Sequence, residues 1–329
     1  MRVRPSEEGA ALLAVLLLVA VMASLSAVAL EKMTLAARTA GNAAASEQAR
    51  AYALGAETYA LLRVSDLTRA SPDRTTLAGG WQGNPIRIPL PAGAATATVT
   101  DGGNCFNVNS VVRPPEEISL QTGFAADPRG IGQFVALLQL AGVPTDEAAR
   151  IADGLADWAD TDSNPQPAGA EDAAYAGLPV PYRTPNRPLV DVSELRAVAG
   201  VTPEIYAAVE PWLCALPEAV RSPINVNTLT PAQAPLLAML LPGQLGLEDA
   251  RTLIARRPAN GWPRIGDFWT EPAVRSLVKG DVERQTVLKT RWFRLRLDVE
   301  LDGAQLTEIA LIDAGSNPAR LVSRNWGQD

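Results

Sequence analysis

The residues best suited to do chemistry lie in one acidic segment near the middle of the chain. Asp160, Asp162 and Asn164 stand at alternate positions, and Glu171 follows eleven residues after Asp160. This is the ligand spacing of a helix-loop-helix calcium loop, in which carboxylate and amide oxygens surround the ion. The sixth position holds Pro165 instead of glycine, so the segment lacks the sharp turn of that motif and is not an EF-hand.

The residues alone leave several functions open for this segment. Hard oxygen donors without histidine or thiolate favour Ca²⁺ over transition metals. The same aspartates could instead cap helices and form Asx turns in a solvated loop. A pair of carboxylates could also serve a glycoside hydrolase, but the only aromatic residues beside the segment are Trp158 and Tyr175, so the sequence does not favour an enzyme.

Composition excludes other classes of chemistry. The 329 residues contain no histidine and two cysteines, so neither an imidazole base nor a zinc cage of Cys and His can be built. An apolar content of 47% is sufficient for a sizeable core. The net charge of −7 disfavours binding to a phosphate backbone, so nucleic acid is not expected as a partner.

An uncharged segment near the N-terminus predicts a membrane-spanning helix. Twenty-one residues from Ala10 to Leu30 carry no charge, and a helix of that length is about 30 Å long, which matches a bilayer core. A cleaved signal peptide usually has a shorter apolar core and a helix breaker after it. Here no proline lies between Pro5 and Pro72, so the helix is expected to continue to about Arg63.

Beyond the membrane segment, this helix carries small and aromatic residues at intervals of three and four positions. Such a stripe predicts one face that packs on a sheet. Its members are Ala45, Ala49, Tyr52, Ala56 and Tyr59.

Strand-like segments flank a long helical stretch and predict one sheet interrupted by an insertion. The first strands lie within residues 86–112, and a second pair spans 292–299 and 305–312 around a turn at Asp302-Gly303. Between Pro114 and Thr286, short amphipathic helices alternate with proline and glycine. Helices are expected at 134–140, 147–158, 192–198, 203–213, 231–240 and 247–255.

Gly9 stands directly before the apolar segment, with charged residues ahead of it. This arrangement resembles the class III leader of type IV pilins and type II secretion pseudopilins. In that family a prepilin peptidase cuts after the glycine and methylates the new amine, which here would be that of Ala10. Most members carry glutamate at the fifth mature position, where this chain has Ala14. That departure fits the K-type minor pseudopilins, which sit at the tip, although a degenerate pilin would show it too.

The insertion also resembles the helical domain of K-type pseudopilins, so the likeness covers nearly the whole chain. The matching segments are 157–162, 169–172 and 224–228. The resemblance implies an α+β chain with a pilin-like fold, in which a long N-terminal helix packs on a small antiparallel sheet that carries a large all-α inserted domain. The expected parts are a leader at 1–9, a transmembrane and pilin helix at 10–65, a first β region at 66–113, the helical insert at 114–286 and a second β region at 287–329.

The resemblance further implies calcium, because K-type pseudopilins carry it in their helical domain. The ligands would be Asp160, Asp162, Glu171 and Asp172, with Asp157 and Asn186 as further candidates. The implied function is that of a non-enzymatic minor pseudopilin at the tip of the pseudopilus, which initiates assembly and helps to export folded proteins across the outer membrane. The implied location is the bacterial inner membrane, spanned once, with most of the chain in the periplasm. Implied partners are the I- and J-type minor pseudopilins, the major pseudopilin and the prepilin peptidase, with secreted exoproteins as further candidates.

Cys105 and Cys214 would then lie in the periplasm, where an even number of cysteines favours pairing. A bridge would close a loop of about a hundred residues and remove roughly 4 to 5 kcal/mol of unfolded-state entropy. The alternative is two buried thiols that never meet, because sequence spacing does not fix distance.

A second functional hypothesis comes from residues 224–262, which look like a helix-hairpin-helix module of DNA-binding type. A membrane-anchored periplasmic DNA receptor would use backbone amides at the hairpin to bind phosphate, with Arg251, Arg256, Arg257 and Arg264 supplying positive charge. The acidic total and a hairpin one residue longer than usual count against this hypothesis.

Overall fold

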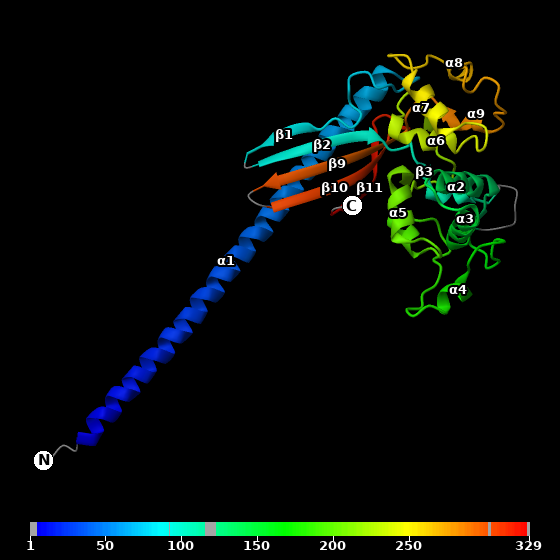
Figure 1. The fold of residues 1–329 in the computed structure, drawn as a ribbon. Coiled ribbons are helices and arrows are strands. Elements are labelled where there is room, and N and C mark those ends of the chain that lie inside the picture. The colour runs from blue at the N-terminus through cyan, green and yellow to red at the C-terminus, as the bar shows by residue number, and fades with distance from the viewer. Residues whose placement is uncertain (1–4, 92, 116–122, 302–303, 328–329) are drawn as a thin grey trace.

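The computed structural model describes residues 5–91, 93–115, 123–301 and 304–327 (Figure 1). It consists of one very long helix, a sheet packed on the far end of that helix, and a helical body beyond the sheet. The expected turn at Asp302-Gly303 and the first four residues of the expected leader lie outside the described residues.

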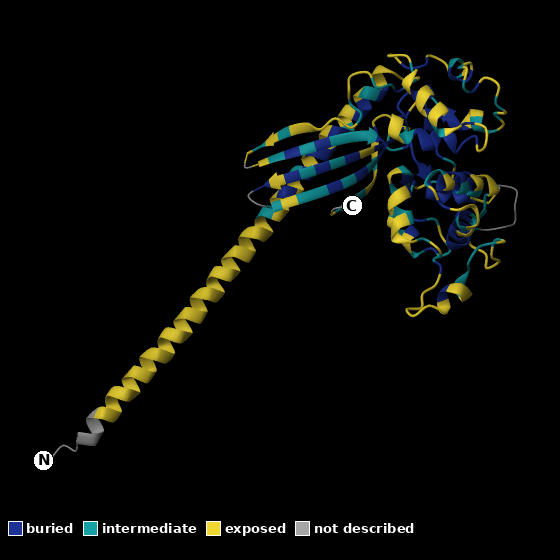
Figure 2. Cartoon of the chain, in the orientation of Figure 1, coloured by how far each residue is buried: buried dark blue, intermediate teal, exposed yellow. Residues whose placement is uncertain are grey.

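Helix α1 (Pro5–Ala70) contains 66 residues and is about 100 Å long. It continues beyond the expected end near Arg63, because the next proline comes only at Pro72. Every residue from Gly9 to Ala44 is exposed, whereas the C-terminal third lies against the sheet (Figure 2). The predicted continuous helix is confirmed.

The sheet has five antiparallel strands in the order β1-β2-β9-β10-β11. Because β2 pairs directly with β9, the sheet is assembled from two segments separated by the helical body, as the sequence predicts. The edge strand β11 was not predicted, since its polar residues hide the strand pattern. The strands are β1 (Ile86–Leu90), β2 (Gly93–Asp101), β9 (Trp292–Leu301), β10 (Ala304–Asp313) and β11 (Arg320–Trp326).

The predicted stripe on α1 is correct only for part of its members. Ala49 and Ala56 are buried, but Tyr59 is 48% exposed and Tyr52 is half-buried. The buried row consists instead of residues small enough for the helix to lie close to the large side chains of β9, such as Phe293. Its members are Ala49, Ala53, Ala56, Ala60 and Val64.

The helical body comprises residues 104–290. Of its expected helices, 247–255 matches the observed bounds, whereas 192–198 forms a 3₁₀ helix and 203–213 and 231–240 are divided into 3₁₀ and α segments. The α-helices are α2 (Pro128–Leu140), α3 (Thr145–Ala159), α4 (Asp172–Ala176), α5 (Pro203–Val209), α6 (Ala234–Ala238), α7 (Leu247–Ala255), α8 (Ile265–Trp269) and α9 (Val282–Gln285). The 3₁₀ segments are Val108–Val111, Val192–Ala197, Glu210–Trp212 and Pro231–Gln233. The remaining strands are β3 (Phe106–Asn107), β4 (Val112–Arg113), β5 (Ala125–Ala126), β6 (Leu213–Cys214), β7 (Ile224–Asn225) and β8 (Thr286–Val287).

One continuous hydrophobic core fills the body, and it begins earlier in the chain than the expected boundary at residue 114. Phe106, Val108 and Val112 are buried in this core, and Phe106 stacks on Phe134 of α2 with ring centroids 4.9 Å apart. The chain therefore leaves the sheet directly after β2, and the residues that follow belong to the body by their packing.

The body contains two halves built on the same plan, residues 104–218 (the first half) and 224–290 (the second half). Each begins with a two-residue strand that pairs in parallel with a strand from the end of the same half, β3 with β6 and β7 with β8. In each, the segment Asn-Val-Asn follows the first strand residue, at 107–109 and at 225–227. The first asparagine of each segment accepts a hydrogen bond from the backbone N–H of the second.

The second asparagine of each segment clamps the backbone of a distant residue. Asn109 accepts the N–H of Leu189 and donates to its carbonyl oxygen. Asn227 makes the same two bonds with Trp262. In the sequence, the two Asn-Val-Asn segments are the signal of this repeat.

Candidate functional site

Three of the four expected calcium ligands meet at one place in the first half. Asp160 follows the C-terminal end of α3, Asp162 lies in the loop after it, and Glu171 precedes α4. Carboxylate oxygens of these residues all lie within 4.8 Å of one another. The helix end and the short helix α4 therefore bring together residues that are eleven positions apart in the sequence.

Burying these three carboxylates in their ionised form costs free energy unless a positive charge lies beside them. Asp160 is fully buried, and both of its carboxylate oxygens lack a hydrogen-bond partner among the described residues, as does Oε1 of Glu171. Burial, followed by the charges of Asp162, Asp157 and Glu171, raises the pKa of Asp160 to about 7. Burial is also the main cause that raises the pKa of Glu171. Unpartnered oxygens that converge in this way are what a divalent cation would satisfy, so the residues fit Ca²⁺.

Neighbouring carboxylates of α3 hold the loop in place. Asp157 Oδ1 accepts the N–H of Gln166 at 2.9 Å, and Asp153 Oδ2 accepts that of Ala168 at 3.0 Å. Gly169 is required by this close approach, because a Cβ there would lie 1.9 Å from Asp157 Oδ2. Asp157 thus supports the loop beside the carboxylate group.

Asp172 and Asn186 lie in an adjacent hydrogen-bond network. Asp172 Oδ1 accepts both the backbone N–H and the hydroxyl of Thr184, each at 2.9 Å, and Asn186 Oδ1 lies 2.5 Å from the same hydroxyl. Among the described residues, the carboxylates that converge are those of Asp160, Asp162 and Glu171, and neither Asp172 nor Asn186 is part of this group. Their role as ligands stays a prediction.

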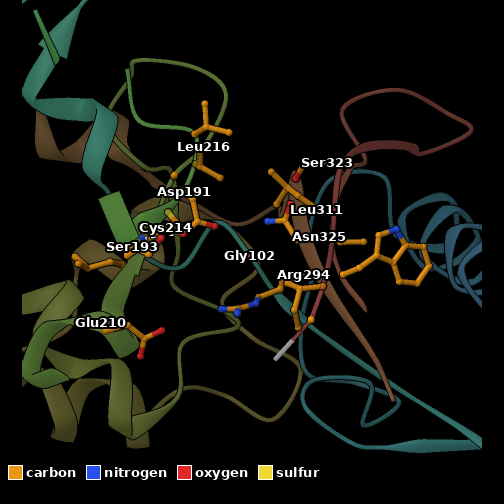
Figure 3. Close-up of a pocket in the computed structure, with 18 of the residues that line it drawn as sticks. Gly102, Asp191, Ser193, Glu210, Cys214, Leu216, Arg294, Leu311, Ser323 and Asn325 are labelled. Carbon is orange, nitrogen blue, oxygen red and sulfur yellow. Dashed lines mark hydrogen bonds between the residues drawn. The ribbon is translucent and has the colours of Figure 1, made fainter. Parts of the chain in front are cut away.

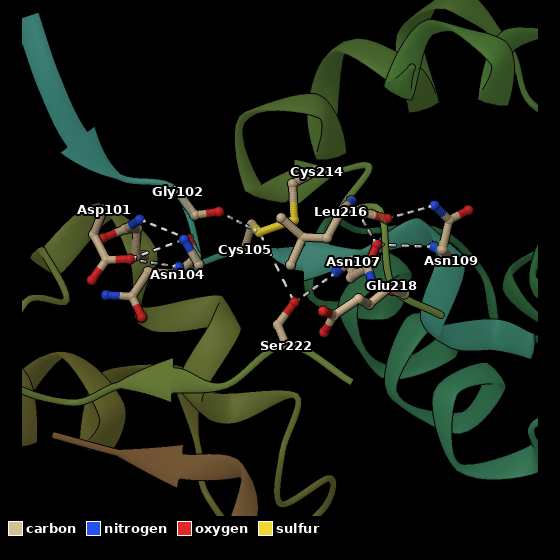
Figure 4. The surroundings of a disulfide bond; sticks show 12 residues. Asp101, Gly102, Asn104, Cys105, Asn107, Asn109, Cys214, Leu216, Glu218 and Ser222 are labelled. Carbon is tan, nitrogen blue, oxygen red and sulfur yellow. Dashed lines mark hydrogen bonds between the residues drawn. A yellow bond between two sulfur atoms is a disulfide. The ribbon is translucent and has the colours of Figure 1, made fainter. Parts of the chain in front are cut away.

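Cys105 and Cys214 form a disulfide, with their Cα atoms 5.8 Å apart (Figure 4). The bridge joins the chain leaving the sheet to β6 at the end of the first half, beside the pairing of β3 with β6. The alternative of two separate thiols is therefore wrong. The backbone around the bridge is held by Asn107, whose side-chain amide donates to the carbonyl oxygens of Glu218 and Val220.

The helix-hairpin-helix segment uses several of its arginines within the body. Arg257 is half-buried and donates from Nη1 to the carbonyl oxygen of Leu229 at 2.6 Å. Arg251 pairs with Glu248 and Arg264 with Asp267. Of these arginines, Arg257 packs into the body, whereas Arg251 and Arg264 are exposed and have their charges paired with acidic residues of the same segment.

The N-terminal helix has the length and composition to cross a membrane. The described helix from Gly9 to Ala70 contains an apolar window with no part buried inside the structure. Ser24 within it donates to the carbonyl oxygen of Ala20 at 2.8 Å, so its hydroxyl is satisfied inside the helix. Ala14, at the position where a glutamate is usual, is exposed on this helix.

These features define the class of protein. A long helix with an apolar N-terminal part that continues under a small antiparallel sheet is the architecture of a pilin-like protein. In this chain a helical body is inserted in the sequence between β2 and β9, which are neighbours in the sheet.

Comparisons with known proteins specify the family. Two family models described as "Type II secretion system (T2SS), protein K" match residues 104–218 and 224–290. Type II secretion system protein K of Pectobacterium carotovorum is 33% identical over 324 residues, covering 98% of each chain. The Klebsiella pneumoniae protein of the same name is 33% identical over 98% of this chain and 97% of its own length. This chain belongs to the type II secretion system protein K family and is a K-type minor pseudopilin.

A solved structure confirms the fold. The crystal structure of the GspK-GspI-GspJ complex from enterotoxigenic Escherichia coli contains a chain that matches with a TM-score of 0.76 and 30% identity. The match covers 86% of this chain and 97% of that chain. The predicted fold class, with a pilin-like sheet and a helical insert, is thereby confirmed.

Proposed function

We propose that this protein is the tip subunit of the type II secretion pseudopilus, where it initiates assembly and helps to export folded proteins across the outer membrane. The observation that carries this proposal is the position of the helical body. It lies at the end of α1 opposite the apolar segment, beyond the sheet (Figure 1). A body of that width, placed above the sheet, leaves no room for an identical copy stacked along the helix axis.

The tip position can be tested directly by labelling. An epitope in the exposed segment 178–181 after α4 should appear once, at the distal end of each pseudopilus, when pili from overproducing cells are viewed with gold-labelled antibody. Label distributed along the pilus shaft would contradict the proposal. The major pseudopilin, labelled in parallel, serves as the control for access along the shaft.

The partners at the tip would be the I- and J-type minor pseudopilins. A chain similar to this one was solved in a GspK-GspI-GspJ complex, and the likeness extends over most of both chains. Exposed residues of α1 between the membrane segment and the sheet offer helical surface for such neighbours. Co-expression should yield a stable complex with both partners, and recovery of each protein alone would contradict this assignment.

Entry into the inner membrane would follow removal of the leader. We infer cleavage after Gly9 by the prepilin peptidase and methylation of the Ala10 amine, with the mature chain anchored by residues 10–30 and its remainder in the periplasm. Ala14 leaves this subunit without the carboxylate that would pair with the amine of a subunit above, which suits a position with nothing above it. Mass spectrometry of the membrane-extracted protein, produced with and without the peptidase, tests this; an intact Met1 in the presence of the peptidase would contradict it.

Calcium would bind the carboxylates of Asp160, Asp162 and Glu171. The ion would supply a positive charge to both carboxylate oxygens of Asp160 and to Oε1 of Glu171, which have no hydrogen-bond partner among the described residues, and the protein would contribute a site partly enclosed by α3 and α4. Asp172, which is adjacent to Glu171, remains the fourth proposed ligand. At a calcium concentration a hundredfold above the dissociation constant, binding would stabilise the folded state by about 2.7 kcal/mol. A melting temperature that does not respond to chelator would contradict the site.

A further inference from the structure

The sheet and the helical body are joined by two crossings of the chain, residues 102–105 on the way out and 288–291 on the way back. Beside these crossings lies an open cleft of about 670 Å³. Figure 3 shows its two walls, with Arg294, Leu311 and Asn325 from the sheet facing Asp191 and Leu216 from the body. If the two crossings were the sole links between the sheet and the body, the body could rotate relative to the sheet into the space of this cleft.

Buried polar bonds fix the second half of the body to the crossings. The carboxylate of Asp101, at the end of β2, accepts hydrogen bonds from the hydroxyls of Thr228 and Thr290. Asn225 donates to the carbonyl oxygen of Thr75 and to Thr290 Oγ1. These bonds form one attachment point, and a body attached at one point can still rotate about it.

Arg291 forms a second attachment at a different part of the body. Its guanidinium donates to both carboxylate oxygens of Glu218, at 3.0 and 2.7 Å, and to both of Asp313, at 2.9 Å each. Asp313 ends β10 of the sheet, whereas Glu218 is the last residue of the first half of the body. The guanidinium also stacks on Trp292, with Cζ 4.4 Å from the ring centroid. Two bidentate pairs in a fixed fork geometry define direction as well as distance.

We propose that Arg291 is the positioning residue that fixes the orientation of the helical body on the sheet, by binding Glu218 of the body and Asp313 of the sheet at the same time. The cleft beside it explains why such a link is needed, since no packed core fills the space between the two walls. The proposal concerns the isolated chain and does not depend on its position in a pseudopilus.

Distance measurements by electron spin resonance test this lock in the full chain in detergent micelles. Spin labels on Gln305→Cys in the sheet and Asp146→Cys in the body, both exposed positions, report the orientation of one part relative to the other. Glu218→Ala should raise the fraction of molecules outside the main distance peak about tenfold, which corresponds to about 1.4 kcal/mol. Arg291→Lys should also broaden the peak, because lysine cannot make bidentate bonds.

Glu210→Ala is the matched control, since Glu210 lines the same cleft and its removal changes the charge equally. The proposal expects its distance distribution to equal that of the unmodified protein. It is overturned if Glu218→Ala leaves the distribution unchanged, or if Glu210→Ala broadens it as much. Melting temperatures of all variants show whether they are folded, and a loss of stability without broadening would mean that Arg291 stabilises the fold without setting the orientation.

Discussion

The two halves of the helical body use the same asparagine clamp to close very different lengths of chain. In the first half, Asn109 holds Leu189 across 80 residues. In the second half, Asn227 holds Trp262 across 35 residues. The extra chain of the first half contains the acidic segment and α4, whereas the second half passes from α7 to Trp262 by a short turn.

The longer loop of the first half needs additional interactions to hold it in place. Between residues 161 and 188, Tyr175 and Thr184 are the only described residues that are buried, so the hydrophobic packing of this loop is concentrated on Tyr175, whose ring contacts Trp158 and Tyr182. The first half also carries the disulfide, the backbone bonds to Asp153 and Asp157, and the carboxylate group suited to Ca²⁺. The short turn of the second half has less conformational entropy to lose and has no equivalent of these devices among the described residues.

The largest effect is expected from removing the disulfide, which occurs in the first half only. Replacing both Cys105 and Cys214 by Ala should lower the free energy of unfolding by about 4 kcal/mol, because the bond closes a loop of 109 residues. Urea unfolding measures the loss, and amide hydrogen exchange locates it. Exchange should accelerate mainly in the first half; equal acceleration in both halves would show that they do not differ in this way.

The asparagine clamps should instead have similar effects in the two halves. Asn109→Ala removes bonds to Leu189 and a further bond to the carbonyl oxygen of Leu216, for an expected loss of about 3 kcal/mol. Asn227→Ala removes the two bonds to Trp262, for an expected loss of about 2 kcal/mol. Each clamp is the control for the other in urea unfolding. A negligible effect of one variant beside a large effect of the other would refute the equivalence of the halves.

The sheet contains a buried carboxylate of its own with a raised pKa, so its stability should depend on pH independently of the carboxylates in the body. Glu308 is fully buried between β10 and α1, next to Glu57, and both face Arg324. Arg324 donates to Glu57 at 2.7 and 2.8 Å, whereas neither oxygen of Glu308 has a hydrogen-bond partner with good geometry among the described residues. Burial, followed by the neighbouring Glu57, raises the pKa of Glu308 to about 8.

A raised pKa means that the folded state keeps a proton that the unfolded chain has lost. The free energy of unfolding of the sheet should therefore fall as pH rises from about 5 to 8, by on the order of 2 kcal/mol. Glu308→Gln keeps a neutral side chain of the same shape and should remove the part of the slope that Glu308 contributes, while the part due to Asp160 and Glu171 in the body remains. Unfolding in urea at a series of pH values, in the presence of chelator, provides the measurement. A slope in the Gln variant equal to that of the unmodified protein would assign the whole effect to other groups.

Much of the fold could be predicted from the sequence because its signals are local. The long helix follows from the absence of proline up to Pro72, and the paired strands β9 and β10 follow from alternating residues such as Arg294 and Leu295. Strand β11 was missed because an edge strand with Arg320 and Arg324 lacks an apolar face of its own. Whether a strand is present there is decided by pairing with β10, which is a tertiary contact.

The site could be predicted only in part for a related reason. The spacing of Asp160, Asp162 and Glu171 was visible in the sequence, but their choice as calcium ligands came from the family resemblance, and the structure brings carboxylate oxygens of these three together. Asp172 follows Glu171 directly, but in α4 its side chain turns toward Thr184, and no spacing rule reveals that choice. The prediction that Tyr59 faces the sheet was wrong, because the sequence does not show how closely the helix approaches the sheet.

We propose that calcium holds the extra loop of the first half, and hydrogen exchange with and without Ca²⁺ tests this proposal most directly. Calcium should slow exchange at the amides of residues 160–188 and leave the second half unchanged, whereas Asp160→Asn together with Glu171→Gln should abolish the response. Exchange that is insensitive to calcium throughout the loop, or slowed equally in both halves, would contradict the account.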